Sequence, residues 1–226
     1  MVTSSIAGML LGLLVGLRHA FEPDHLTAMA TLVTETRDVR GGAALGALWG
    51  IGHTISLVVV GAILIGLGLV LPTRVAVVFE LAVSVVLVGL GVRAVVRAWR
   101  EGVVGPARPH AHGGRGHLHA GPDLHLHLGR WTLAWRPLAV GLVHGLAGSG
   151  ALTALVFAQL PSTAERIVYI SVFGVGSIVG MAAASAFVGA SLGMFHRGQR
   201  WLTLGAGALS IGLGIAWSVP LFAQLV

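Results

Sequence analysis

The sequence contains no cysteine and no lysine, and only 10% of its 226 residues are charged. An ordinary soluble domain carries about 25% charged residues, so this chain lacks the polar side chains that a water-exposed surface needs. Without cysteine it has neither a disulfide framework nor thiol chemistry. Hydrophobic residues make up 55% of the chain, which is too many for a disordered tail. These features exclude a soluble enzyme, a disulfide-stapled secreted domain and a disordered protein.

Six stretches are long enough to cross a bilayer, which takes about 20 mostly apolar residues per helix. They cover residues 4–35, 41–71, 75–97, 137–160, 167–195 and 200–225. The first arginine is Arg18, so no basic segment precedes the first stretch and we do not interpret it as a cleaved signal peptide. The sequence predicts an all-α polytopic membrane protein with six transmembrane helices.

All 14 basic residues are arginines, and they are distributed unevenly between the connections. With six spans, eleven arginines fall on one side of the membrane and only two, Arg74 and Arg166, on the other. The positive-inside rule makes the arginine-rich side cytoplasmic. We therefore expect a multi-pass protein of the cytoplasmic (plasma) membrane with both termini outside. The net charge of +6 reflects this topology and not a nucleic-acid partner, which would require a soluble basic face.

The two halves of the chain resemble each other. The matching stretches are Gly16–His19 with Gly141–His144, Gly50–His53 with Gly174–Ser177, and Gly89–Val92 with Gly212–Ile215. Their offsets are 125, 124 and 123 residues. These matches predict that the chain consists of a first three-helix repeat over 1–100, a loop over 101–132 and a second three-helix repeat over 133–226. Because each repeat has three spans, the second is inserted upside down, which is typical of transporters; duplication in a membrane protein of another function is the alternative.

The first span contains a cluster of ionisable residues. Arg18, His19, Glu22, Asp24 and His25 lie within eight positions, and such residues inside a membrane are costly and functional by default. His19, Asp24 and His25 offer two imidazoles and a carboxylate, a donor set suited to Ni²⁺, Co²⁺, Zn²⁺ or Cu²⁺. On a straight helix these three side chains would point in different directions. Pro23 predicts a break that lets them converge and frees the carbonyl of His19.

Two histidines of other spans are further candidate ligands. His53 lies at a depth similar to that of His25, counted along each helix, and His144 lies in the fourth span beside a glycine-rich stretch. A helix–helix hydrogen bond is the alternative for each of them. Accessory candidates are Glu22, Ser149 and Ser177. Most of five tryptophans are predicted to be interfacial anchors: Trp49, Trp131, Trp135, Trp201 and Trp217.

The segment His19–His25, with the pattern His-x₄-Asp-His, resembles the signature of the nickel/cobalt transporter family. The chain is most similar to the shorter six-helix branch that includes the urease-accessory membrane protein, through Gly16–Ala28, Leu48–Thr54 and Gly141–Thr153, and more weakly through Phe173–Met181. The resemblance implies transition-metal permeation with His19, Asp24 and His25 as essential ligands. The family's acidic second signature is replaced here by the acid-free Gly145–Gly150.

Between the repeats, the composition changes to glycine, proline, arginine and histidine. Three His-x-His pairs lie there: His110 and His112, His117 and His119, His125 and His127. The composition predicts a flexible loop, and the arginine distribution places it in the cytoplasm. Its imidazoles are suited to buffering a transition metal. A solvated spacer with incidental histidines is the alternative.

The sequence thus predicts a secondary transporter that takes up a divalent transition metal, Ni²⁺ or Co²⁺, and not an enzyme. The metal is the transported substrate and no cofactor is expected. Further partners are the lipid bilayer and a cytoplasmic metal acceptor or urease-maturation protein, with no nucleic acid. An exporter, an intramembrane zinc-dependent enzyme using Glu22 as acid and base, and a metal sensor or store are the alternatives.

Overall fold

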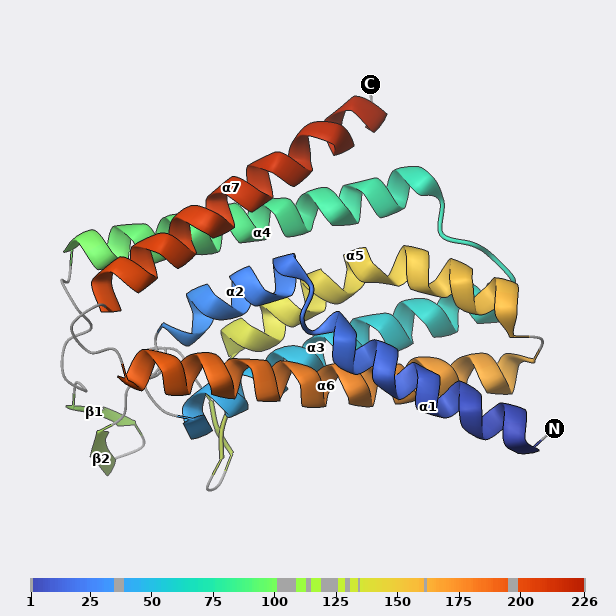
Figure 1. The fold of residues 1–226 in the computed structure, drawn as a ribbon, viewed down its shortest axis with the longest axis horizontal. Helices are drawn as coiled ribbons and strands as arrows, with labels where there is room; N and C mark the ends of the chain where they lie inside the picture. Colours follow the sequence, from blue (N-terminus) through green and yellow to red (C-terminus); the bar gives the residue numbers. More distant parts are fainter. Residues whose placement is uncertain are drawn as a thin grey trace.

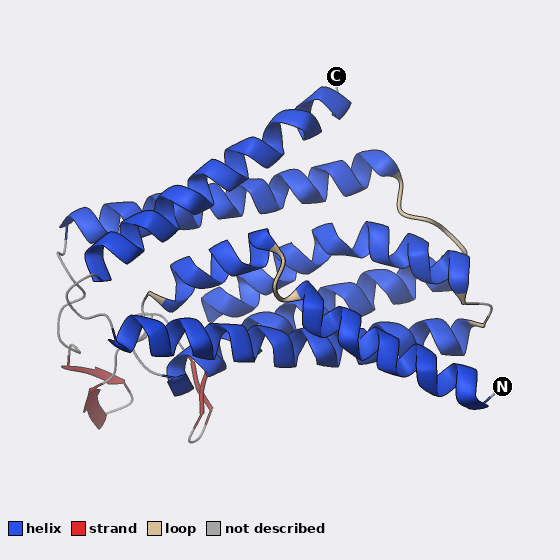
Figure 2. Cartoon of the chain, viewed as in Figure 1, coloured by secondary structure: helices blue, strands red, loops and turns tan. Residues whose placement is uncertain are grey.

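The protein is described from a computed structural model. The structure describes the backbone of residues 2–34, 39–100, 109–112, 115–118, 126–128, 131–133, 135–160, 162–194 and 199–225. Within these ranges it describes the side chains of all residues except 2–7, 100–134, 148–159, 192–193 and 199. These residues form seven helices and four short strands (Figures 1 and 2). The helices are α1 (Val2–His19), α2 (Pro23–Val33), α3 (Val39–Leu67), α4 (Thr73–Arg100), α5 (Trp135–Gln159), α6 (Thr163–Met194) and α7 (Gln199–Leu225). The strands are β1 (Pro109–His112), β2 (Arg115–Leu118), β3 (Leu126–Leu128) and β4 (Trp131–Leu133).

Four helices within the described residues are long and apolar enough to cross a membrane. They are Val39–Leu67, Thr73–Trp99, Thr163–Ser191 and Arg200–Leu225, that is, α3, α4, α6 and α7, and Gly8–His19 of α1 is a shorter apolar helix. Large apolar side chains point outward from three of them: Val85, Phe187 and Trp201 are 71–74% exposed. A soluble protein rarely exposes so much apolar surface, whereas lipid covers it at no cost. The helices therefore indicate a membrane protein.

The helices pack so that elements of the two halves alternate. Helix α3 lies against α5 and α6, α1 lies against α6, and α4 pairs with α7 (Figure 1). The short helix α2 contacts α4, α6 and α7. The core where these helices meet contains Met29, Trp49, Leu87 and Met181, each at most 1% exposed. Elements from both ends of the sequence thus enclose one interior.

Two helix contacts of equivalent residues depend on glycine. A Cβ on Gly16 of α1 would lie 2.9 Å from the carbonyl carbon of Phe173 on α6. A Cβ on Gly141 of α5 would lie 2.9 Å from the carbonyl carbon of Trp49 on α3. Only glycine allows backbones to approach so closely, which is how helices pack without a hydrophobic driving force. The two contacts are related by offsets of 125 and 124 residues, like the sequence matches.

In Figure 1 the N-terminus lies at the right of the view, the C-terminus at its top, and the hairpin of β1 and β2 at its lower left. The strands form two antiparallel hairpins, β1 with β2 and β3 with β4. In the first hairpin His110 stands opposite His117, and in the second His127 stands opposite Thr132. The segment 101–132, predicted to be a flexible loop, therefore contains regular structure; His119 and His125 lie outside the described residues.

Candidate metal centre

The polar break in the first span separates two helices and brings their ends together. Helix α1 ends at His19, and Pro23 is the first residue of α2, joined by a short turn that Figure 2 draws as a loop. Glu22 is extended, with φ −64° and ψ 147°, the conformation that a following proline favours. The carbonyl that Pro23 was expected to free is occupied, because the Glu22 N–H donates to the His19 oxygen at 3.0 Å. Asp24 and His25 therefore lie in the first turn of α2, and the ring of His25 lies close to that of His19.

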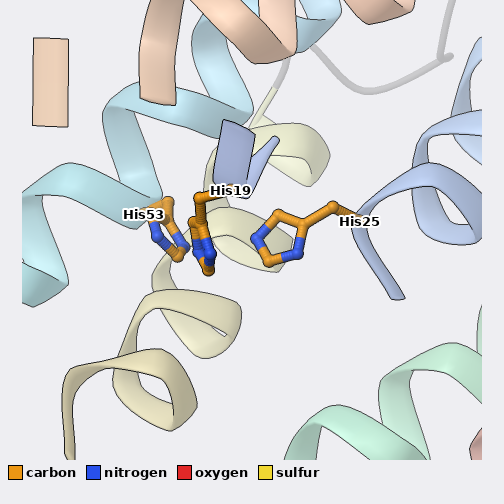
Figure 3. A group of neighbouring side chains, drawn as sticks. All are labelled: His19, His25 and His53. Carbon is orange, nitrogen blue, oxygen red and sulfur yellow. The ribbon is translucent and has the colours of Figure 1, made fainter. Parts of the chain in front are cut away.

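A first group of ligand atoms comes from three histidines on three helices. His19, His25 and His53 offer ring nitrogens that all lie within 4.8 Å of one another. Ring centroids are 4.4 Å apart for His19 and His25, 5.1 Å for His19 and His53, and 5.3 Å for His25 and His53. Figure 3 shows the three rings converging on one space. Nitrogens around a tetrahedral ion at about 2.1 Å are about 3.4 Å apart, so small side-chain rotations would close this group on a metal.

A second group contains the carboxylate. Asp24, His25 and His144 also offer three ligand atoms within 4.8 Å of one another. Nε2 of His144 lies 2.9 Å from Oδ2 of Asp24, and Nδ1 of His25 lies 3.1 Å from Oδ1 of Asp24. The centroids of His25 and His144 are 4.5 Å apart. The sequence did not determine whether His53 and His144 lie near the ligands of the first span. In the structure both lie close to His25.

Most of these ring nitrogens are buried without a hydrogen-bond partner. Both nitrogens of His53, both of His25, Nε2 of His19 and Nδ1 of His144 find none among the described residues. His53 is 0% exposed, and His25 and His144 are each 2% exposed. Buried polar groups in proteins are nearly always paired, and leaving one unpaired costs about 1–3 kcal/mol. A cluster of such groups indicates a site whose partner is a ligand.

Aromatic side chains enclose the imidazoles. Trp49 stacks on His25, with centroids 5.5 Å apart and an interplanar angle of 16°, and meets His144 edge-on at 5.4 Å. Phe173 lies 5.3 Å from the ring of His19. The prediction that Trp49 is an interfacial anchor is wrong, because its side chain is 1% exposed. The spacing could have revealed it, since residues four apart on a helix share a face and Trp49 precedes His53 by four.

A cavity of about 580 Å³ leads to the cluster. Its lining includes His19, Asp24, His25 and His144, whereas the fully buried His53 does not reach it. Further charged groups in the lining are Arg18, Glu22 and Glu80, and Trp217 and Leu221 of α7 form part of its apolar wall. A cation in this cavity could therefore reach the cluster, and the carboxylates of Glu22 and Glu80 in the lining attract cations.

The remaining predicted site residues lie elsewhere. Glu22 is at the rim, with a 53% exposed side chain and Oε1 at 3.0 Å from Nδ1 of His19. Ser177 is fully buried, and its hydroxyl donates to the carbonyl of Gly16 at 3.4 Å, so it faces a helix contact. The side chains of Ser149 and of the loop histidines His110, His112, His117 and His127 are outside the described part of the structure.

Comparison with known proteins finds two relatives. The chain is 30% identical over 179 residues to the urease accessory protein UreH of Bacillus sp. (strain TB-90), covering 79% of this chain and 75% of that protein. It is 26% identical over 230 residues to the chloroplast protein FOR GROWTH AND FERTILITY 2 of Arabidopsis thaliana, covering 93% of this chain and 56% of that protein. No family model and no solved structure matches the chain.

Proposed function

The chain belongs to the family of the urease accessory protein UreH, and from this premise we propose that it transports a divalent transition-metal ion across the cytoplasmic membrane, with Ni²⁺ as substrate and Co²⁺ as a close competitor. An accessory protein is not an enzyme, so the family agrees with the prediction that this chain has no catalytic activity. The metal is cargo that the protein binds and releases.

The observation that carries the proposal is the buried cluster of four imidazoles and one carboxylate. Inside a predominantly apolar helical protein, ionisable groups mark the path of an ion or a proton. Imidazole nitrogen with one carboxylate oxygen is a donor set for Ni²⁺, Co²⁺, Zn²⁺ or Cu²⁺, whereas Mg²⁺ and Ca²⁺ prefer oxygen alone. His19, Asp24, His25, His53 and His144 are the proposed ligands, and Glu22 is an accessory group at the rim.

We assign six membrane spans, with α1 and α2 together forming the first, broken one. Their arrangement as an inverted 3+3 repeat is supported by glycine contacts that recur between the halves. A Cβ on Gly52 would overlap the carbonyl oxygen of Leu138, and one on Gly176 would overlap that of Leu13. Gly52 and Leu138 are related to Gly176 and Leu13 by offsets of 124 and 125 residues. Such repeats hold substrate sites at their interface, near the bilayer midplane.

The orientation follows from the arginines. An even number of spans leaves both termini on one side of the membrane. The arginine-rich connections, including the histidine-rich segment 101–132, then lie in the cytoplasm. An inside-negative potential favours inward movement of a divalent ion by about 4.6 kcal/mol per 100 mV, which makes uptake possible without ATP. The histidine-rich segment would buffer arriving metal or pass it to a cytoplasmic acceptor such as a urease-maturation protein.

The test is accumulation of radioactive nickel in intact cells that express the protein, compared with His19→Ala and Asp24→Ala at matched expression. Ser171→Ala serves as the control, because its exposed hydroxyl bonds only to the Ile167 carbonyl of its own helix at 2.8 Å. Uptake predicts that wild type and the control raise cell nickel and that both cluster variants abolish the rise. A fall in cell nickel that the variants reverse would identify an exporter. No response to nickel or cobalt, with zinc tightly bound in purified protein, would favour the zinc enzyme.

A further inference from the structure

The two groups of ligand atoms share one residue, His25. We propose that they are two successive positions for one metal ion. The outer position is formed by Asp24, His25 and His144, and the inner position by His19, His25 and His53. His25 transfers the ion between them. This inference rests on the proposed transport function and concerns the route of the ion within it.

His25 presents a different nitrogen to each group. Its Nδ1 lies 3.1 Å from Oδ1 of Asp24, in the outer group. Figure 3 shows the other ring nitrogen directed towards His19, in the inner group. Nε2 is buried without a hydrogen-bond partner among the described residues. The ring therefore stands between the two positions and can bind an ion on either side.

The chemistry of imidazole makes the two positions mutually exclusive. A neutral ring has one nitrogen with a free lone pair and one that carries a proton. An ion held on Nδ1 leaves the proton on Nε2, and an ion held on Nε2 requires the proton on Nδ1. In the transfer the metal–Nδ1 bond breaks and the metal–Nε2 bond forms, while the proton that leaves Nε2 is returned to Nδ1 through solvent in the cavity that His25 lines, so the ring stays neutral and no proton is gained or lost overall. Asp24 then accepts a hydrogen bond from that new N–H.

The cavity determines the order of the two positions. Every member of the outer group lines it, and this group holds the one carboxylate of the cluster. A carboxylate attracts a hydrated cation more strongly than neutral imidazoles do, so the ion binds there first. Of the inner group, His19 also lines the cavity, but His53 is 0% exposed and is not part of its lining. The inner position has only neutral ligands, which bind firmly enough to replace water and still release the ion.

Two ligand atoms of the outer position are joined by a hydrogen bond that a bound metal would replace. Nε2 of His144 lies 2.9 Å from Oδ2 of Asp24, within hydrogen-bond distance. A cation bound to both atoms needs the lone pair of Nε2, so the proton of His144 moves to its Nδ1, which has no hydrogen-bond partner among the described residues.

The test uses purified full-length protein with Co²⁺ as the probe. The six loop histidines are replaced by serine throughout, so that the signal comes from the helices. Bound Co²⁺ per chain is measured by equilibrium dialysis, and the number of imidazole ligands by X-ray absorption. His53→Ala removes a ligand of the inner position only, His144→Ala one of the outer position only, and His25→Ala removes the shared ligand.

We expect one Co²⁺ per chain in the parent and in both single-position variants. The imidazole count is three in His144→Ala, from the intact inner position, and two in His53→Ala, from the intact outer position. Transport is lost in both, because the ion needs both positions. His25→Ala weakens binding by at least about 100-fold, beyond the 10–100-fold typical of groups that only support a ligand. His53→Gln and His144→Gln repeat the comparison if an alanine variant does not fold.

Three results would overturn the two-position route. Loss of all binding in either folded His53 or His144 variant would show one composite site. Two Co²⁺ ions bound to the parent at once would show independent sites. An identical imidazole count in the two variants would show that they bind the ion in the same place. Absence of Co²⁺ and Ni²⁺ binding in the parent would instead refute the proposed transport function itself.

Discussion

Substituting alanine for Gly141 tests whether close helix contact positions the metal ligands. A Cβ there would lie 2.9 Å from the carbonyl carbon of Trp49 and would overlap its oxygen. Nonbonded carbons pack at about 3.5–4.0 Å, so α5 and α3 must separate locally by at least about 0.6 Å. His144 is one helical turn from Gly141 and moves with it. Metal–ligand distances tolerate about 0.2 Å, so we expect binding and uptake to fall by at least about 10-fold.

The same change has a calculable effect on stability. Overpacking costs about 1–3 kcal/mol, and because the clash is with the backbone of a packed helix, we expect a value in the upper half of that range. Alanine recovers at most about 1 kcal/mol over glycine in a helix. The net loss is therefore about 1–3 kcal/mol. Gly212→Ala is the matched control, since a Cβ at Gly212 meets no atom within 4 Å.

The assays are initial rates of nickel uptake at matched expression and melting of the detergent-purified protein. Gly141→Ala should melt at a lower temperature and transport more slowly than wild type, whereas Gly212→Ala should equal or exceed wild-type stability. Gly16→Ala, at the equivalent contact with Phe173, should lose as much as Gly141→Ala. If Gly141→Ala behaves like Gly212→Ala in both assays, the close contact does not position the site and the reasoning is refuted.

Four other outcomes are expected. Asp24→Asn keeps the size of the side chain but removes its charge, and should lower kcat/KM for nickel uptake at least about 10-fold; unchanged uptake would exclude the carboxylate as a ligand. Ser56→Ala removes a hydroxyl that donates to the Leu142 carbonyl at 2.6 Å, and should destabilise the protein by about 1 kcal/mol, measured by melting in detergent. Glu80→Gln should raise KM and leave kcat unchanged, with a smaller difference at high salt if the effect is electrostatic. Replacing the six histidines of segment 101–132 with serine should preserve nickel uptake while reducing metal bound by the purified protein.

Much of the fold and part of the site follow from local features of the sequence. Long apolar runs predict the helices because a bilayer fixes their length. Pro23 predicts the helix break because its ring and missing N–H act on its immediate neighbours. The grouping of His19, Asp24 and His25 is likewise local, since all three lie within seven residues. These predictions need no knowledge of how distant segments pack.

The rest of the site depends on packing that hydropathy does not encode. That His53 and His144 meet His25 follows from the close approach of α3 and α5. Trp49 was misassigned because membrane statistics favour tryptophan at interfaces, whereas here its ring stacks on an imidazole. The hairpins of segment 101–132 were missed because strands are recognised by alternating apolar residues, which glycine, proline and histidine do not provide.

The two halves of the chain have equivalent glycine contacts between helices but different candidate metal ligands. His19 and His144 occupy matching positions and both reach the cluster, one in each ligand group. His53 matches Ser177, which is buried and bonds to a helix carbonyl instead. Asp24 matches Ser149 by the same offset and has no acidic counterpart. A fully symmetric site would offer the ion equivalent ligands from both directions. In the proposed two-position route, the carboxylate of Asp24 receives the ion first and the imidazoles of the inner position release it, so that loading and release use different ligands.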